Sequence, residues 1–414
     1  MKRIWRDVRR GAEYWKKFLF WGLCAPVVGA IGGLVGAAFS WCLKYAGLCR
    51  EGFWPWILIG LPAAGLLIVL LYRVCGLEKD PSTNLVLASI REAEAVPMRL
   101  APLIFVGTVL TQLCGGSAGR EGAALQIGGS LGNFLARKGK LEPGEKRILT
   151  MCGMSAVFAA IFGAPVTAMA FAMEVAKVGS VLYSAILPCA LAAVIGYGVS
   201  CLCGVEFEAF GRPDFPGLAW DSVLQSVAVA AVCALVSILF CAALHWAIRL
   251  ARHYLRNPYL RIALGGAVIA GLLVLLGSRY GGAGQELIAR ALSGQALPWD
   301  FAVKLLLTVL TIAAGFKGGE IIPGMAVGAC LGCALAPLLG MDPAFGGAVG
   351  MVALFCGMVN CPLSAILLGV ELLGWEGILY YAVAAAVSYL LSGYSGLYSG
   401  QQFSQSKLEP EETN

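Results

Sequence analysis

Long apolar segments are the feature that most restricts how this chain can fold. A bilayer-spanning helix needs roughly 20 apolar residues. Five stretches meet or approach that length: residues 18–43, 54–72, 180–203, 224–243 and 262–276. Inside lipid, backbone polar groups have to be satisfied within the protein, which leaves helices or closed barrels. Because these runs have helical length, we expect an all-α polytopic membrane protein with on the order of 10 spans or more.

Charge is scarce and gathered beside the apolar runs. Only 13% of the 414 residues are charged, about half the share in soluble domains, and the net charge is +6. The cations do not suggest nucleic acid, because they flank apolar runs. Cations in short cytoplasmic segments orient a membrane protein, so we expect a cytoplasmic N-terminus, with residues 1–17 as an interfacial helix. The first apolar run lacks a small-residue cleavage site and is longer than a secretory signal.

Cysteines and tails add no further chemistry. Many of the fifteen cysteines stand singly in apolar runs, where cysteine packs as a small hydrophobe. Cys330 and Cys333 form one CxxC pair with no second pair to complete a metal site. We therefore expect no metal and no cofactor. The polar tail at 405–414 is too short to be a regulatory soluble domain.

The chain also contains an internal repeat. Residues 128–136 read GGSLGNFLA and residues 328–336 read GACLGCALA, and each stretch follows a glutamate, Glu121 or Glu320. A second landmark, a glutamate nine residues after a proline, recurs in the same order: Pro165 with Glu174, and Pro362 with Glu371. Two landmarks in register indicate a duplication. We assign the two halves to residues 18–205 and 218–404.

Repeated halves are typical of transporters, whose substrate sites form between the repeats near the midplane. Residues 115–122 and 315–323 are glycine-rich turns that each open an apolar helix. Irregular backbone at membrane depth is tolerated only where it lines a cavity or is buried in protein. A helix N-terminus carries unpaired N–H groups and partial positive charge. Two such ends that converge would bind an anion without a full cationic side chain.

Glutamates beside an anion site have two interpretations. An ionised Glu121 carboxylate would occupy the anion position, whereas a protonated one would leave it and carry a proton, which couples proton to anion movement. Alternatively, Glu121 caps its own helix. We favour the coupling role, because ionisable residues inside membranes are functional by default. Glu320 has the same two interpretations. Glu174 and Glu371 lie late in apolar helices and are expected to be structural or near an interface.

Four motifs in order resemble the CLC family of chloride channels and proton-coupled anion antiporters. Gly119-Arg120-Glu121-Gly122 resembles the family's G-(K/R)-E-G-P signature, with Ala123 in place of proline and Q-I-G-G at 126–129. Residues 153–174 and 360–371 resemble matching elements of the two halves, and Leu397-Tyr398-Ser399 resembles the stretch with the anion-coordinating tyrosine. The resemblance extends over roughly residues 18 to 404 and implies a CLC-type inverted-topology repeat of many tilted and broken helices.

Departures from the family pattern point to its fluoride-transporting branch. Glu320 stands where the chloride branch has a different residue, in the context G-F-K-G-G-E. The chloride branch's G-S-G-I-P motif is absent, and residues 80–85 occupy its place. Asn84 is our best candidate to replace the chloride-coordinating serine, with Ser82 and Thr83 as rivals. The internal proton glutamate of the chloride antiporters is Val175 here, as expected of the fluoride branch.

Two positions depart from the fluoride branch as well. Ile322 replaces a threonine that is frequent in that branch, and no aromatic residue lies between Asp80 and Ile90. These departures put the corresponding contacts with the anion in doubt.

The resemblance implies a fluoride/proton antiporter that exports fluoride across the cell membrane as a multi-pass homodimer with one pathway per subunit. Glu121 would be the gate and proton carrier, and Glu320 would set selectivity or the proton route. The implied anion-binding residues are Asn84, Gly119, Arg120, Gly122, Ile321, Ile322 and Tyr398.

Alternative functions remain within and outside this family. A chloride/proton antiporter or passive chloride channel of the same fold is the first alternative. An intramembrane serine hydrolase is the second, since residues 115–119 match G-x-S-x-G at Ser117. Neither His245 nor His253 lies in a glycine-broken segment to serve as its base. We therefore expect no enzyme.

Overall fold

A computed structural model describes residues 2–77, 82–92, 94–207 and 210–408 of the chain. Within those ranges the fold consists of sixteen α-helices and one pair of two-residue strands, so the all-α prediction is confirmed. Six helices are long and apolar enough to cross a membrane, and four shorter apolar helices accompany them. Large apolar side chains such as Leu23, Leu202 and Leu275 are exposed on the outside, as expected for lipid-facing positions.

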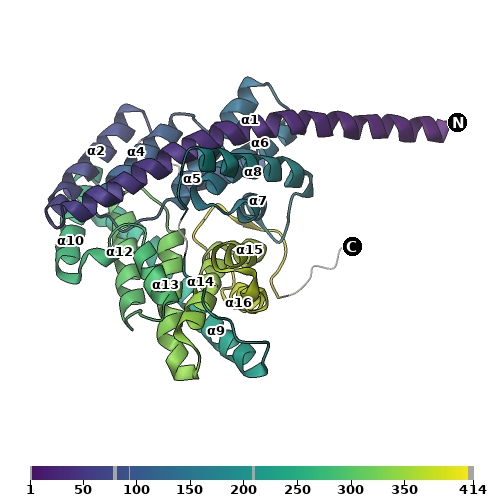
Figure 1. The fold of residues 1–414 in the computed structure, drawn as a ribbon. Helices are drawn as coiled ribbons and strands as arrows, with labels where there is room; N and C mark the ends of the chain where they lie inside the picture. The colour runs from purple at the N-terminus through teal and green to yellow at the C-terminus, as the bar shows by residue number, and fades with distance from the viewer. Residues whose placement is uncertain (1, 78–81, 93, 208–209, 409–414) are drawn as a thin grey trace.

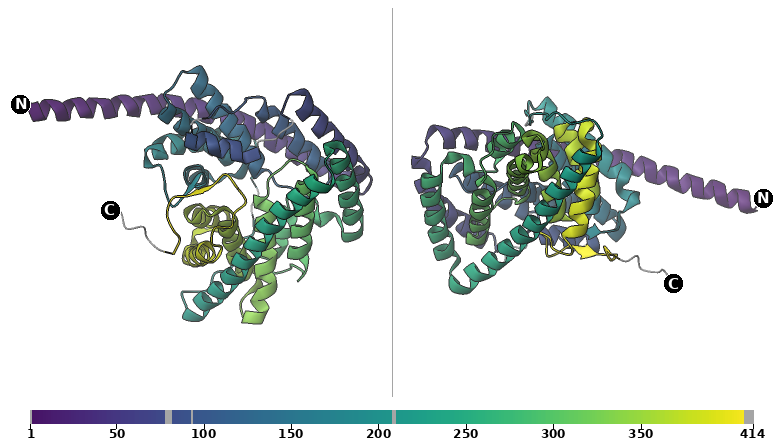
Figure 2. Two further views of the ribbon diagram at one scale, coloured as in Figure 1. Left: turned by 180° about the vertical axis from the view of Figure 1, so that it is seen from behind. Right: turned by 90° about the horizontal axis from the view of Figure 1, so that it is seen from below.

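The first half contains eight helices: α1 (Lys2–Gly52), α2 (Gly60–Val74), α3 (Ser82–Glu92), α4 (Leu100–Leu113), α5 (Glu121–Lys138), α6 (Pro143–Phe162), α7 (Pro165–Glu174) and α8 (Ile186–Leu202). Helix α1 extends past the bundle at its N-terminal end (Figures 1 and 2). Helix α1 is unbroken, so the segment 1–17 that is predicted to lie at the interface continues directly into the first span. Met1 of that segment is outside the described residues.

The second half also contains eight: α9 (Trp220–Tyr254), α10 (Pro258–Leu276), α11 (Gln285–Leu292), α12 (Asp300–Ala314), α13 (Ile321–Leu335), α14 (Pro343–Val359), α15 (Pro362–Leu373) and α16 (Ile378–Leu391). In Figure 1 the first half lies above and the second half below. The two halves present matching elements in the same order, as an inverted repeat requires. The boundaries 18–205 and 218–404 stay a prediction.

Glycines let the central helices of each half pack closely. In the first half, a Cβ on Gly128 would collide with the carbonyl of Gly153, so α5 and α6 are in backbone contact. In the second half, Gly328 meets Gly350 in the same way, which joins α13 to α14. Small residues where two helices meet permit their backbones to approach closely in membranes. This packing is the physical reason for the repeat found at 128–136 and 328–336.

The two halves are joined at the centre by a symmetric backbone contact. The N–H of Gly119 donates to the carbonyl of Gly319 at 2.6 Å, and the N–H of Gly319 donates to that of Gly119 at 2.9 Å. The N–H of Ser117 donates to Thr311 Oγ1, and the N–H of Lys317 donates to Thr111 Oγ1, both at 3.2 Å. The glycine-rich segments therefore cross at a pseudo-two-fold axis.

The C-terminal segment returns from the second half to the first (Figure 1). Its strand β2 (Gln402–Phe403) pairs in parallel with β1 (Lys177–Val178). The Lys407 ammonium donates to Asn360 Oδ1 at 2.6 Å and to the carbonyl of Tyr389 at 2.7 Å. Burial lowers the pKa of Lys407 to about 8. These contacts fix the irregular stretch that carries Tyr398. Part of the predicted polar tail, 409–414, lies outside the described residues.

Candidate functional site

Glu121 is the first residue of α5, and its side chain is fully buried where the two halves cross. Its carboxyl lies against the bare backbone of Gly119 and Gly319. A Cβ on either glycine would overlap the carboxyl oxygens. Glycine is therefore required at both positions for the carboxyl to occupy this space, and the crossing point forms a cradle for it.

The carboxyl of Glu121 is surrounded by helix N-termini but is not fixed by them. Backbone N–H groups of Arg120, of Glu121 itself and of Ile322 face it, the first two at the start of α5 and the third at the start of α13. Neither carboxyl oxygen makes a hydrogen bond of standard geometry within the described part of the chain. Glu121 therefore makes no capping hydrogen bond of standard geometry, and its two interpretations stay predictions. The partial positive charge of the helix N-termini favours a carboxylate in this position, but no hydrogen bond of standard geometry fixes it.

Two cavities are lined by residues close to Glu121 in the chain. The larger has a volume of about 960 Å³, and Gln126 of α5 contributes to its wall. Its lining includes Arg73, His245, Arg252, Arg261 and Lys317, together with Glu320. The smaller, of about 350 Å³, is lined by Arg50, Arg120 and the Lys44–Glu206 ion pair, among others. Arg120, directly before Glu121, lines the smaller cavity, and Gln126 of α5 lines the larger one, so Glu121 lies between the two cavities along the chain.

All three residues considered for the serine-replacing position line the larger cavity. Asn84 Oδ1 accepts from the N–H of Gly400 at 2.8 Å, and Asn84 Nδ2 donates to Ser82 Oγ at 3.2 Å. Thr83 Oγ1 accepts from Gln126 Nε2 at 3.3 Å and faces the Gly122 backbone. Thr83 therefore lies beside the start of α5, whereas Asn84 also anchors the C-terminal segment. The preceding residues of this motif, Asp80 and Pro81, lie outside the described residues.

Tyr398 and Glu320 line the same cavity. The Tyr398 hydroxyl is buried and has no hydrogen-bond partner among the described residues, and Glu320 and Glu121 are within electrostatic range of it. Glu320 is the residue that precedes α13, yet its side chain makes no capping hydrogen bond to that helix. The cap interpretation of Glu320 is therefore not observed either.

The remaining predicted residues divide between backbone and packing roles. Gly122 faces the Gly319 backbone and Thr83. The Arg120 guanidinium lies 5.2 Å from the centre of the Phe162 ring. Ile321 and Ile322 are buried in the first turn of α13.

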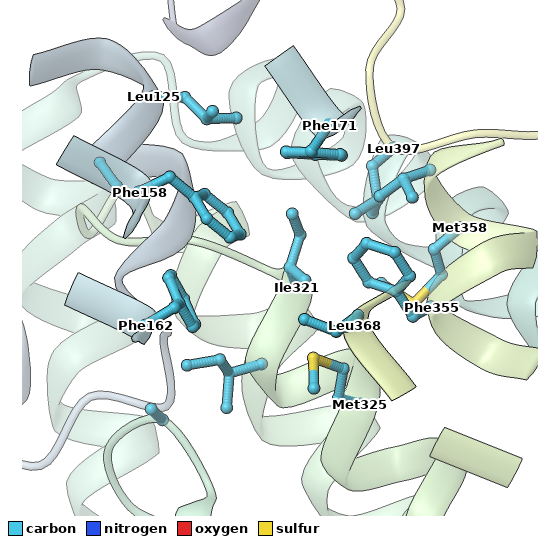
Figure 3. Packing of buried hydrophobic residues seen from close by; sticks show 14 of the residues in the cluster. Leu125, Phe158, Phe162, Phe171, Ile321, Met325, Phe355, Met358, Leu368 and Leu397 are labelled. Atoms are coloured by element: carbon cyan, nitrogen blue, oxygen red, sulfur yellow. The ribbon is translucent and has the colours of Figure 1, made fainter. Parts of the chain in front are cut away.

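Aromatic residues that sequence reasoning did not identify surround Ile321 (Figure 3). Residues 80–90 contain none, but Phe158 and Phe162 of α6, Phe171 of α7 and Phe355 of α14 gather around this side chain. Three helices from both halves supply them, so no local pattern revealed the cluster.

Glu174 and Glu371 are structural, as expected. Glu174 accepts hydrogen bonds from the N–H groups of Leu363 and Ser364 and from the Ser364 hydroxyl, at 3.2, 3.0 and 2.6 Å. Glu371 accepts from the N–H groups of Val166 and Thr167, at 3.0 and 2.7 Å. Each carboxylate therefore caps the N-terminus of the other half's helix.

Fold and site together define a multi-pass membrane protein with an inverted repeat and a glutamate at the crossing of its broken helices. The family model described as "Voltage gated chloride channel" matches residues 64–393. The chain therefore belongs to the CLC family of voltage gated chloride channels, which confirms the resemblance found in the sequence.

Individual relatives agree with this assignment. The chain is 35% identical over 395 residues to a chloride/fluoride channel protein of Pseudomonas syringae pv. tomato, covering 94% of this chain and 87% of the relative. It is 26% identical to the H(+)/Cl(-) exchange transporter ClcA of Yersinia pestis bv. Antiqua (strain Angola), covering 84% and 79%.

Solved structures show the same fold. The crystal structure of a CLC-type fluoride/proton antiporter superimposes with a TM-score of 0.90 at 33% identity, covering 94% of this chain and 98% of that one. The structure of a slow cyanobacterial Cl-/H+ antiporter gives 0.79 at 22% identity, covering 89% and 93%, and supports the fold alone.

Proposed function

We propose that this protein is a secondary active transporter that exports fluoride in exchange for protons. The observation that carries the proposal is the buried Glu121 carboxyl in the Gly119–Gly319 cradle, which faces the N-termini of α5 and α13 but makes no hydrogen bond of standard geometry within the described residues. A carboxyl that only stabilised the fold would be expected to have its lone pairs satisfied when buried.

The proposed cycle alternates two occupants of the same space. The ionised carboxylate occupies the cradle, where the N-termini of α5 and α13 favour negative charge. An anion arriving from the larger cavity competes for these N–H groups. Protonation removes the charge of Glu121, so its side chain leaves and the anion replaces it. Release of the proton on the other side reverses the exchange, and one side chain thus couples the two fluxes.

The other predicted site residues receive roles in this scheme. Tyr398 would donate its unpartnered hydroxyl to the anion, and Asn84 or its rivals Ser82 and Thr83 would complete the site from α3. Gly119, Arg120, Gly122, Ile321 and Ile322 would present backbone at the two helix starts. Their arrangement around the larger cavity and the cradle supports these roles.

Fluoride is favoured over chloride by Glu320 and by the similarity to proteins described as a chloride/fluoride channel and a fluoride/proton antiporter. Fluoride is the stronger hydrogen-bond acceptor, and a protonated carboxyl at Glu320 would be a donor to it. A chloride/proton antiporter or a passive chloride channel is the alternative, and the similarity to a chloride exchanger favours it.

A hydrolase is disfavoured although Lys304 Nζ lies 2.9 Å from Ser117 Oγ. Both side chains are fully buried, and neither lines the two cavities described above. The lysine also donates to two backbone carbonyls, which is unsuited to a general base. We propose a transporter without enzymatic activity.

We further propose a homodimer in the cell membrane with a cytoplasmic N-terminus. The homodimer is inferred from the family resemblance, and the orientation from the cations before the first span. Single-molecule counting of labelled subunits in liposomes would test the dimer, and one label per particle would contradict it.

The central experiment compares fluoride and chloride efflux from proteoliposomes while proton uptake is recorded. Fluoride efflux faster than chloride efflux, and able to drive protons uphill, is the expected result. Equal rates for the two anions would overturn the fluoride assignment. Anion flow without proton movement would replace the antiporter with a channel.

A further inference from the structure

Lys304 is a charged residue that the scheme above does not use. It lies on α12 of the second half and is fully buried. Its ammonium uses all three donors: to Gly282 O at 2.7 Å, Ser117 Oγ at 2.9 Å and Tyr280 O at 3.1 Å. Burying a charge is costly, and intramembrane charges are expected to have a function.

No carboxylate neutralises Lys304 directly. Asp300 lies one turn earlier on α12, but its oxygens accept from the Tyr280 hydroxyl at 2.5 Å and the Leu297 N–H at 2.9 Å, with Arg279 at 3.6 Å. Within the described ranges, Lys304 forms no ion pair. Its ammonium is hydrogen-bonded but its charge remains uncompensated by a contact.

One face of α12 forms hydrogen bonds with Ser117, in the glycine-rich segment that leads to Glu121. Ser117 lies four residues before Glu121 and contacts Lys304, Thr308 and Thr311, which are spaced to share a face of α12. The second half therefore positions the backbone that carries the gate of the first half.

The pseudo-symmetry of the two halves shows what is special about this contact. Thr111 of α4 receives the N–H of Lys317 as Thr311 of α12 receives that of Ser117. The same hydrogen bond, from a backbone N–H to a threonine hydroxyl of the other half, is thus present once in each half. The residue of α4 that corresponds to Lys304 is Ile104, and the residue of α13 that corresponds to Glu121 is Ile321. The buried lysine is paired with the segment whose glutamate is the first residue of its helix, whereas the other segment carries Glu320 one residue before its helix and has Ile104 in place of the lysine.

We propose that Lys304 is a positioning residue for the gate, which fixes the 115–119 segment through Ser117 and stabilises the ionised Glu121 carboxylate in its cradle. The inference depends on the proposed gating role of Glu121. Arg120 acts electrostatically on Glu121, and Glu121 is among the charged groups that act on Tyr398 and Lys304. Arg50 and Cys330 also act on Lys304. Loss of the lysine charge therefore favours the protonated, open gate.

The test is the pH dependence of fluoride efflux from proteoliposomes for wild type, Lys304→Met and Ser117→Ala. The rate of fluoride efflux should fall as the pH rises. In Lys304→Met this fall is expected at a pH about one unit higher than in wild type, because a buried unit charge is removed near the gate. Ser117→Ala retains the charge and loses the contact, so its turnover should drop without a shift of the profile. An unshifted profile for folded Lys304→Met would overturn the proposal.

A double variant separates this proposal from the gating role itself. In a Glu121→Gln background, Lys304→Met should leave the pH profile of any residual anion flow unchanged, and a shift there would refute action through Glu121. Absence of proton-coupled transport in wild type would instead overturn the proposed function. Should Lys304→Met not fold, Asp300→Asn keeps the lysine and removes a nearby negative charge. It should shift the profile toward lower pH, and a shift to higher pH would contradict the inference.

Discussion

Helix N-termini meet glutamates at two junctions between the halves, with opposite results. At the α7–α15 junction, Glu174 and Glu371 each accept hydrogen bonds from the other helix's first N–H groups. At the α5–α13 junction, Glu121 faces two helix starts without a hydrogen bond of standard geometry, and Glu320 does not cap α13. Hydrogen bonds of standard geometry fix Glu174 and Glu371 at the first junction, whereas none fixes Glu121 at the second within the described residues.

The difference shows which of the broken helices can serve an anion. Helices α7 and α15 begin with proline, which has no N–H, and carboxylates occupy their next two N–H groups. Their positive ends are therefore already compensated. At α5 and α13 the N–H groups face the Glu121 carboxyl without a hydrogen bond of standard geometry in the described part of the chain, so this pair is the better candidate for a mobile charge.

The largest effect is expected from Glu121→Gln, which removes the titratable group at the unfixed junction. Proton-coupled fluoride exchange should fall to background, with transport either stopped or reduced to passive anion flow. Simultaneous recording of fluoride and protons in proteoliposomes distinguishes these outcomes. Unchanged coupled flux would refute the role of Glu121.

Gly319→Ala should come close to that loss without touching a titratable group. The new Cβ would overlap the Glu121 carboxyl and lie 2.6 Å from the backbone nitrogen of Gly122. The gate can then no longer occupy its cradle, and coupled exchange should be lost. Gly271→Ala on α10 is the matched control, because its added Cβ meets nothing within 4 Å. Wild-type coupling in Gly319→Ala would contradict the cradle.

Glu174→Ala tests the fixed junction and should affect stability. It leaves two N–H groups of α15 unsatisfied, and hydrogen bonds to charged groups contribute roughly 1.5–3 kcal/mol each. Thermal unfolding of the detergent-solubilised protein should occur at a clearly lower temperature. Glu371→Ala, with two hydrogen bonds rather than three, should lower it less. A change in anion selectivity without loss of stability would show that the junctions are not different in kind.

Glu320→Gln should change the ratio of fluoride to chloride transport, or the fluoride rate, by a moderate factor. The substitution keeps the size of the side chain on the wall of the larger cavity but removes its charge and titration. Parallel efflux assays with both anions measure the ratio. A ratio and rate equal to those of wild type would exclude Glu320 from selectivity and the proton route.

The smallest effect is expected from Tyr398→Phe. It removes one hydroxyl that has no hydrogen-bond partner among the described residues, so the fold should keep its stability. If the hydroxyl binds the anion, affinity should drop by about fivefold, which corresponds to roughly 1 kcal/mol for one hydrogen bond. Isothermal titration with fluoride measures this change, and unaltered affinity would remove Tyr398 from the site.

The sequence by itself determined the class of fold and singled out the candidate gate. Apolar length selects spanning helices, and the repeated glycine pattern indicates two related halves with broken helices. Glu121 was found because an ionisable residue beside glycines is conspicuous in an apolar chain. The apolar length and the glutamate beside glycines are local features, each readable within one segment of about 20 residues, and the repeat needs only a comparison of two such segments.

Only the tertiary structure decided how the segments meet. The Gly119–Gly319 contact, the exchange of caps by Glu174 and Glu371, and the Ser117–Lys304 contact all join residues from different halves. Lys304 was visible as a charge in an apolar stretch, yet its partner lies 187 residues away. Hydropathy and periodicity contain no information about such pairs, because crossing geometry and packing between the halves create them.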